Sequence, residues 1–414
     1  MSTTLPGRTP GADDEARATA PADEKAPTPT VAPPEPLPTP ADAPKPPTTP
    51  ADAPPQREPQ QPSPPTAPPP IQLPRVSARR PVLVAFVVLI GAILLGVSVG
   101  PADISLPTVL SGLLGHLPLI HYHSHTSALD WDVIWQIRLP GVVLAGMVGA
   151  MLAGGGAAYQ GVFRNPLADP YLLGVAAGAG LGATIVIVQN SGTDLHQVLP
   201  FAAFAGGIGA VVLTYLVGAT SGRRASTASI VLAGVAVAAL LTAIQTYLQQ
   251  QHEPDLQGVY AWILGSLGTA SWSDVTLILP YVALSAIVLF LHRRLLDVLR
   301  VGEEEAGALG VHAARVRLTV VAAATLGTAA AVSVSGLIGF VGIIVPHTVR
   351  LLSNASYRVV LPVSMIGGAA FLILADVVAL NLQAPAQIPI GVVTAFVGAP
   401  FFLFLLRSRR TGVL

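Results

Sequence analysis

Few residues of this chain could carry out chemistry by themselves. The sequence contains no cysteine, so disulfides and thiolate metal sites are excluded. Its only lysines, Lys25 and Lys45, lie near the N-terminus, and neither is followed by Ser or Thr. The phosphate-binding loop GxxxxGK[ST] needs that lysine to contact the phosphates of a nucleotide. If ATP drives this protein, another chain must hydrolyse it, and we expect neither enzyme activity nor a cofactor in this chain.

Four histidines in one polar stretch, His116, His121, His123 and His125, are the residues best suited to bind a metal ion. In an extended segment, residues i, i+2 and i+4 share one face, so the last three could converge on one ion. No acidic or cysteine residue stands in register to complete a ligand set. We therefore assign no metal site, and metal binding by this loop remains an alternative.

A single carboxylate, Asp376, occurs within an apolar segment. Ionisable residues within membrane segments are costly and usually functional. Asp376 lies near the end of its segment, so we interpret it as a helix-packing or gating residue. An ion-coupled secondary transporter would need ionisable side chains near the middle of the bilayer. Only Asp376 approaches that requirement, which disfavours this class of transporter.

The elements that must position these residues are membrane-spanning helices. Hydrophobic residues make up 52% of the 414 residues and charged residues only 11%, with a mean hydropathy of +0.63. A helix needs about 20 apolar residues to cross a hydrocarbon core of about 30 Å. Such runs predict an all-α integral membrane protein with about ten transmembrane helices. The predicted spans are 81–100, 139–160, 171–190, 198–219, 228–249, 275–291, 316–335, 337–352, 361–380 and 388–406.

The distribution of arginine predicts how these spans are oriented. Fourteen arginines follow residue 80, and all but Arg138 lie in alternate connections or at the C-terminal end. The intervening connections carry acidic residues instead. Because Arg and Lys are enriched on the cytoplasmic side of membrane proteins, both termini are predicted to be cytoplasmic. The formal net charge of zero conceals this asymmetry.

The N-terminal segment differs in composition from the rest of the chain. Twenty-four of the 39 prolines precede residue 75, mixed with Ala, Thr, Asp and Glu. Such a segment buries too little apolar surface to offset its conformational entropy, so we expect it to be disordered or extended polyproline II. The chain is therefore divided into a cytoplasmic tail, 1–78, and a ten-span domain, 79–414. The tail is interpreted as a spacer or dispensable extension, with partner binding as the alternative.

The stretch from Arg138 to Thr184 is the most distinctive part of the sequence. It is glycine-rich, which allows neighbouring helices to approach closely, and it breaks at Asn165 and Pro166. Its motifs are Arg138-Leu139-Pro140, Tyr159-Gln160-Gly161, Phe163-Arg164-Asn165-Pro166-Leu167-Ala168-Asp169-Pro170 and Leu172-Leu173-Gly174. Together they resemble the membrane permeases of ABC importers for iron-siderophore, haem and cobalamin. Further matching blocks are 262–267, 299–311, 335–347 and 387–402, so the resemblance covers about residues 81–410.

This resemblance implies a permease that moves a ferric siderophore across the cytoplasmic membrane of a bacterium by alternating access. Haem and cobalamin are the alternative cargoes. In the family, two permease subunits surround a central pathway, an ATP-binding cassette ATPase dimer binds inside, and a substrate-binding protein binds outside. ATP would then bind only to the partner ATPase. The lipid bilayer would be a further partner, and no nucleic acid would be. A purely structural membrane scaffold is the third alternative.

The resemblance also implies roles for particular residues. The ATPase-coupling segment comprises Arg300, Gly302, Glu303, Glu304, Glu305, Ala306, Leu309 and Gly310. Composition alone would leave this segment as a solvated connection between helices. The residues expected on the translocation pathway are Gln160, Asn165, Pro166, Gln245 and Thr246.

Docking of the binding protein is expected to involve arginines on the outer face, and only Arg138 fits. Gly141 stands where the family usually has a second arginine, Leu380 where another is often seen, and Gln387 where a glutamate is typical. Two arrangements would accommodate these missing charges. One is a homodimer with altered docking contacts, and the other is a heterodimer in which a second permease supplies the arginines. We favour the heterodimer because it preserves charge pairing on at least one lobe of the binding protein.

Overall fold

The computed structural model describes residues 79–100, 104–116, 126–190, 197–219, 227–353, 356–384 and 386–410. The chain divides into two units, Met1–Gln72 and Leu73–Leu414, and every described residue belongs to the second. The predicted disordered tail over 1–78 lies outside the described residues, and so do His121, His123 and His125, for which metal binding was kept as an alternative.

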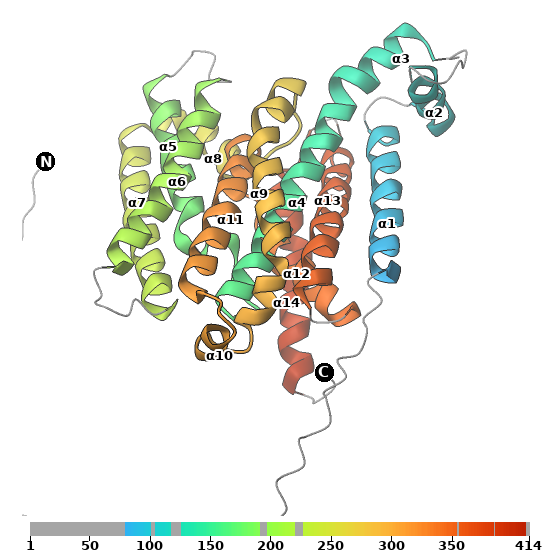
Figure 1. Cartoon of the computed structure of the whole chain (residues 1–414). Helices are drawn as coiled ribbons and strands as arrows, with labels where there is room; N and C mark the ends of the chain where they lie inside the picture. The colour runs from blue at the N-terminus through green and yellow to red at the C-terminus, as the bar shows by residue number, and fades with distance from the viewer. Residues whose placement is uncertain are drawn as a thin grey trace, which may run out of the picture. The chain divides into compact units, whose positions relative to one another are not determined.

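The described part of the chain folds into helices joined by short connections, without strands (Figure 1). In chain order these are α1 (Arg79–Ser98), α2 (Leu106–Gly115), α3 (Ala128–Asp132), η1 (Val133–Arg138), α4 (Leu139–Val162), η2 (Pro170–Leu173), α5 (Val175–Gln189), α6 (Val198–Ala219), α7 (Thr227–Gln251), η3 (Glu253–Asp255), α8 (Leu256–Ile263), α9 (Trp272–Leu299), α10 (Glu303–Ala308), α11 (Ala313–Ser335), α12 (Val341–Leu352), α13 (Tyr357–Asn381) and α14 (Ile390–Arg410). The predicted all-α fold class is confirmed.

Each of the ten predicted spans coincides with a helix. Seven segments of the described chain are long and apolar enough to cross a membrane, namely those built on α1, α4, α6, α7, α9, α11 and α13. Of the other three, α14 has 21 residues, whereas α5 with 15 residues and α12 with 12 residues are short. A helix of 15 residues extends only about 22 Å. Non-helical backbone must therefore complete these crossings.

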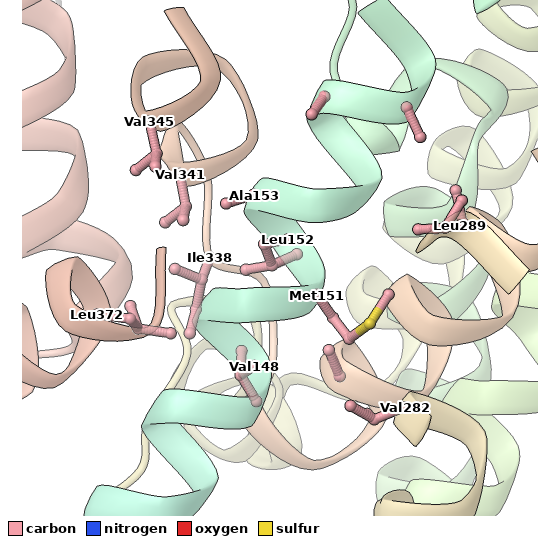
Figure 2. Close-up of a cluster of buried hydrophobic side chains, with 14 of the residues drawn as sticks. Val148, Met151, Leu152, Ala153, Val282, Leu289, Ile338, Val341, Val345 and Leu372 are labelled. Carbon is pink, nitrogen blue, oxygen red and sulfur yellow. The ribbon is translucent and has the colours of Figure 1, made fainter. Parts of the chain in front are cut away.

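Helix α4 lies at the centre of the bundle, with α1 at one edge and α5, α6 and α7 at the other (Figure 1). Figure 2 shows Val148, Met151 and Leu152 of α4 packed among side chains that include Ile338 and Leu372. Helix α1, by contrast, exposes most of its apolar side chains. The core is therefore built around α4, and α1 is left with a wide apolar surface suited to contact lipid.

Glycines let α4 approach its neighbours backbone to backbone. A Cβ atom at Gly149 would lie 2.2 Å from the carbonyl oxygen of Gly368 in α13. A Cβ atom at Gly156 would lie 1.9 Å from the carbonyl oxygen of Gly342 in α12. Non-bonded atoms do not approach so closely, so only glycine fits at these two crossings. The predicted use of the α4 glycines for close helix packing is confirmed there.

Three non-helical segments, 264–266, 336–340 and 386–389, lie next to one another and are joined by hydrogen bonds that include the adjoining helix ends. The amide of Ser266 donates a hydrogen bond to the carbonyl oxygen of Ser335 at 3.0 Å. The amide of Ile390 donates to the carbonyl oxygen of Gly265 at 3.2 Å, and the amide of Gly391 donates to that of Leu264 at 3.1 Å. The hydroxyl of Tyr171 also donates to the carbonyl oxygen of Ile338 at 3.0 Å. Such bonds satisfy backbone groups that lipid could not, so irregular backbone is tolerated where neighbouring helices cover it.

Candidate functional site

A network of polar side chains lies next to the C-terminal end of α4. Arg164, Arg300 and Arg350 meet at this end of the bundle, which is called the arginine-bearing end below. Gln160 of α4 is 2% exposed, and its Nε2 donates to the carbonyl oxygen of Gly342 at 3.1 Å. Its Oε1 accepts a hydrogen bond from Arg350 of α12. The Nη2 of Arg350 donates to the hydroxyl of Tyr357, at the start of α13, at 3.0 Å. Both polar atoms of the Gln160 amide are therefore satisfied, and these bonds fix the orientation of the Arg350 guanidinium.

These side chains form part of a cavity of about 310 Å³. Its lining consists of Gln160, Arg164, Pro166, Arg300, Arg350 and Tyr357. Gln160 and Pro166, which are predicted on the translocation pathway, meet Arg300, which is predicted in the coupling segment. Sequence reasoning missed Arg164, Arg350 and Tyr357 as site residues. The signal that could have identified Arg164 and Arg350 as site residues was their position in the arginine-rich connections between the predicted spans.

The connection between α4 and α5 is held by its own polar side chains. Asn165 is exposed, and its Oδ1 accepts a hydrogen bond from the amide of Leu167 at 3.0 Å. The Oδ1 of Asp169 accepts one from the amide of Tyr171 at 2.7 Å. Asp169 is half-buried, and burial raises the pKa of its carboxyl to about 6. Asn165 thus stabilises the turn after α4 and does not line the cavity.

Helix α10 joins α9 to α11 at the arginine-bearing end of the bundle (Figure 1). It is flanked by Gly302 and Gly310, whose φ angles of 149° and 77° lie in a region that favours glycine. Ala306, on the inner face of α10, is fully buried. The predicted coupling segment is therefore a short helix anchored on the bundle, with sharp turns on both sides, and not a loosely solvated connection.

The side of this segment that faces away from the helix bundle is exposed to solvent. Leu309 is 68% exposed and Val301 is 65% exposed, and the side chains of Glu304 and Glu305 are exposed beside them. Glu303 differs from the other two glutamates because it forms an ion pair with Arg317 of α11. The segment thus combines exposed carboxylates with exposed apolar side chains, a surface suited to contact another protein.

Gln245 and Thr246 of α7, which are also predicted on the translocation pathway, do not line this cavity. Gln245 is 7% exposed, and its Nε2 donates to the Oγ1 of Thr184 at 3.1 Å. Thr184 in turn donates to the carbonyl oxygen of Gly180 at 2.8 Å, so Gln245 ties α7 to α5. Thr246 is exposed, and its Oγ1 donates to the carbonyl oxygen of Thr242 at 2.9 Å. Of this pair, only Thr246 presents its side chain on the surface of the chain.

The structure gives Arg138 an internal position. The residue is 8% exposed, and its Nη1 donates to the carbonyl oxygens of Val97 at 2.7 Å and Ser98 at 2.6 Å. A cation at the carboxyl end of a helix satisfies its last carbonyl groups and interacts favourably with its dipole. In this structure the guanidinium of Arg138 binds the end of α1, and the role of Arg138 in docking a binding protein on the outer face stays a prediction.

Of the four histidines considered for metal binding, only His116 is described. Its ring stacks on Trp131 with centroids 3.7 Å apart, and its Nδ1 donates to the carbonyl oxygen of Gly112 at 2.9 Å. Within the described ranges, no group of three or more His, Asp or Glu residues could hold a metal ion. Asp376 is 7% exposed and does not line the cavity. Its interpretation as a packing or gating residue stays a prediction.

In the described part of the chain, a bundle of seven spanning helices and four shorter apolar helices, with an anchored connecting helix at one end, defines a multi-span membrane transport subunit. Residues 88–408 match the FecCD transport family, and the chain belongs to that family. A solved structure of a metal-chelate type ABC transporter in an inward-facing conformation has the same fold. It matches with a TM-score of 0.70 at 30% identity, covering 80% of this chain and 99% of that chain.

Relatives of this chain are named as import permeases. It is 39% identical over 360 residues to the cobalamin import system permease protein of Halobacterium salinarum, covering 80% of this chain and 96% of the relative. It is 37% identical over 300 residues to the hemin transport system permease protein of Yersinia pestis, covering 70% and 89%. It is 34% identical over 326 residues to the Fe(3+)-citrate import system permease protein of Bacillus subtilis, covering 79% and 94%.

These similarities confirm the resemblance recognised in the motifs. The chain is a membrane permease of the ABC importer class that serves iron chelates, haem or cobalamin. The names of the relatives differ in cargo, so similarity alone assigns the class of transporter and not the molecule carried. Membership of this class also sets aside the ion-coupled secondary transporter and the structural scaffold.

Proposed function

We propose that the chain is the permease subunit of an ATP-driven importer that moves a ferric siderophore across the cytoplasmic membrane of a bacterium. Support comes from membership of the FecCD transport family and from relatives named for hemin and Fe(3+)-citrate. The iron would travel inside its chelator, so no metal ligand is needed in this chain. Cobalamin is the second candidate cargo, because a relative with 39% identity is named for cobalamin import.

ATP hydrolysis by a separate ATPase dimer would act on the permease through α10. The observation that carries this proposal is that α10 is anchored through Ala306 and through the ion pair of Glu303 with Arg317, yet leaves Leu309 exposed. A partner pressing on that face would move α10 with the start of α11, and α11 packs against the central helix α4. The exposed surface would thereby be linked mechanically to the core, as alternating access requires.

The cargo pathway would lie between this chain and a second permease subunit, with a substrate-binding protein docked on the outer face. Gln160, Asn165 and Pro166 lie at the arginine-bearing end, where cargo would leave for the cytoplasm. Thr246, on the surface of α7 near the C-terminal end of that helix, would face the pathway nearer its outer side. Arg138 is the one outer arginine predicted for docking, and in this structure its guanidinium binds the end of α1. That favours a second, different permease subunit.

Transport by a reconstituted complex tests this function. The chain, the ATPase and the binding protein encoded beside it would be purified together and placed in proteoliposomes. Uptake of a radiolabelled ferric siderophore, strictly dependent on the ATPase and on ATP, is the expected result. Preferential uptake of cobalamin would favour the second cargo, and uptake without any ATPase would refute the proposal. Intact-mass measurement of the same complex would show whether it contains one permease sequence or two.

A further inference from the structure

The cavity at the end of α4 gathers positive charge without acidic residues among its lining. Arg164, Arg300 and Arg350 come from three separate parts of the chain, yet all three line the same space of about 310 Å³. The other lining residues, Gln160, Pro166 and Tyr357, carry no charge at neutral pH. Bringing like charges together is unfavourable unless an opposite charge or bulk water compensates them.

Asp297 lies on the other side of Tyr357 and is held by other groups. Its Oδ1 accepts a hydrogen bond from the amide of Tyr357 at 2.7 Å, and its Oδ2 accepts one from Ser356 at 2.7 Å. Its Oδ2 also lies 3.9 Å from the Nε of Arg358. Arg317 lies near enough to Arg164 to repel it, but Arg317 is paired with Glu303. Neither Asp297 nor Glu303 lines the cavity.

Two of the arginines, Arg350 and Arg164, keep N–H groups that could donate hydrogen bonds to a ligand. Arg350 is oriented by Gln160 and Tyr357, which use only two of its five N–H groups. Arg164 is exposed and makes no hydrogen bond or ion pair with the described part of the chain. Its backbone has a φ of 50°, a left-handed conformation that is uncommon for a residue other than glycine. Such conformations are often retained at binding sites.

We propose that this cavity binds a phosphate group, supplied by the head group of an anionic phospholipid. Several guanidinium groups and a phenol hydroxyl converge there, which suits a phosphate with several acceptor oxygens better than a single carboxylate. The cavity lies where α4, α9 and α12 end and α13 begins. The ends of membrane-spanning helices lie close to the lipid head groups. Basic pockets between transmembrane helices on the cytoplasmic side are known to hold anionic head groups. The proposal does not depend on which cargo the permease carries.

Lipid retention by the full-length chain tests this site. The protein would be purified from nanodiscs of phosphatidylcholine mixed with phosphatidylglycerol, and native mass spectrometry would measure which lipid stays bound. We expect a phosphatidylglycerol molecule to be retained in preference to phosphatidylcholine. Arg164→Gln and Arg300→Gln should each weaken retention about fivefold, the effect of one arginine near an anionic surface. The matched control is Arg294→Gln, because Arg294 is exposed on α9, the helix whose end Arg300 directly follows, but does not line the cavity.

A second arm separates the possible sources of the phosphate. Inorganic phosphate added to lipid-free protein in detergent should raise the thermal unfolding temperature of the wild type more than that of Arg164→Gln if free phosphate fills the site. A preference for phosphatidylglycerol without this effect assigns the site to lipid. Absence of both effects, or an equal loss of lipid in Arg294→Gln, would overturn the proposal. Unchanged lipid retention in Arg164→Gln with weakened ATPase binding would also overturn it, in favour of a carboxylate from the ATPase.

Discussion

The Nη1 of Arg138 lies 2.7 Å from the carbonyl oxygen of Val97, and this bond joins the start of α4 to the end of α1. We predict that Arg138→Ala destabilises the protein by about 1.5 to 3 kcal/mol, the range for hydrogen bonds to charged groups. Thermal unfolding in detergent would measure the loss. Arg138→Lys, which keeps the charge near the helix end, should lose less. Unchanged stability together with weaker binding-protein affinity would instead support the predicted docking role of Arg138.

The contact of α4 with α12 gives a second prediction. Gly156→Ala would place a methyl group 1.9 Å from the carbonyl oxygen of Gly342, so the helices must separate. We expect a loss of about 1 to 3 kcal/mol in stability, as for other overpacked cores. Gly141→Ala is the control on the same helix, because nothing lies within 4 Å of its Cβ position. It should be neutral or slightly stabilising. Equal unfolding temperatures for the two variants would contradict the close packing seen here.

Asp169 makes stability depend on pH. Its pKa of about 6 is above the ordinary value of 3.8, so the folded state binds this proton more tightly than the unfolded state does. The resulting stabilisation is present below about pH 3.8 and is lost as pH rises to about 6. Asp169→Asn keeps an oxygen that can cap the amide of Tyr171 but carries no charge. It should raise the unfolding temperature at neutral pH and have little effect near pH 4; the same gain at both pH values would argue against this titration.

The exposed face of the coupling segment gives a prediction about energy transfer. Leu309→Asp should weaken ATPase binding and uncouple ATP hydrolysis from uptake without lowering stability, because the side chain is 68% exposed. Leu382→Asp is the matched control, since Leu382 is 70% exposed and follows α13, which begins at the arginine-bearing end and runs to the other. Binding would be measured by co-purification and coupling by uptake per ATP hydrolysed. If both variants lost activity equally, α10 would not be the specific contact.

Much of the fold could be predicted from the sequence because hydropathy acts locally. A run of apolar residues such as 198–219 must become a helix in lipid, and α6 is Val198–Ala219. The sequence also shows directly that no phosphate-binding lysine is present and that the helix α4 must end before Asn165 and Pro166. The coupling segment followed from its resemblance to the family and from its flanking glycines. Each of these features depends on neighbours in the chain or on the medium, and not on distant residues.

Only the tertiary structure decided which polar residues meet. Gln160 and Arg350 are 190 residues apart in the sequence, and no local pattern indicates that they share a hydrogen bond. Arg138 looked like an exposed outer arginine until the end of α1, 41 residues earlier, was seen to accept its hydrogen bonds. Likewise α5 and α12 could be short only because distant segments bond to the backbone beside them. Periodicity and hydropathy show which face of a helix is buried, but the partner of that face is set by packing among helices far apart in the chain.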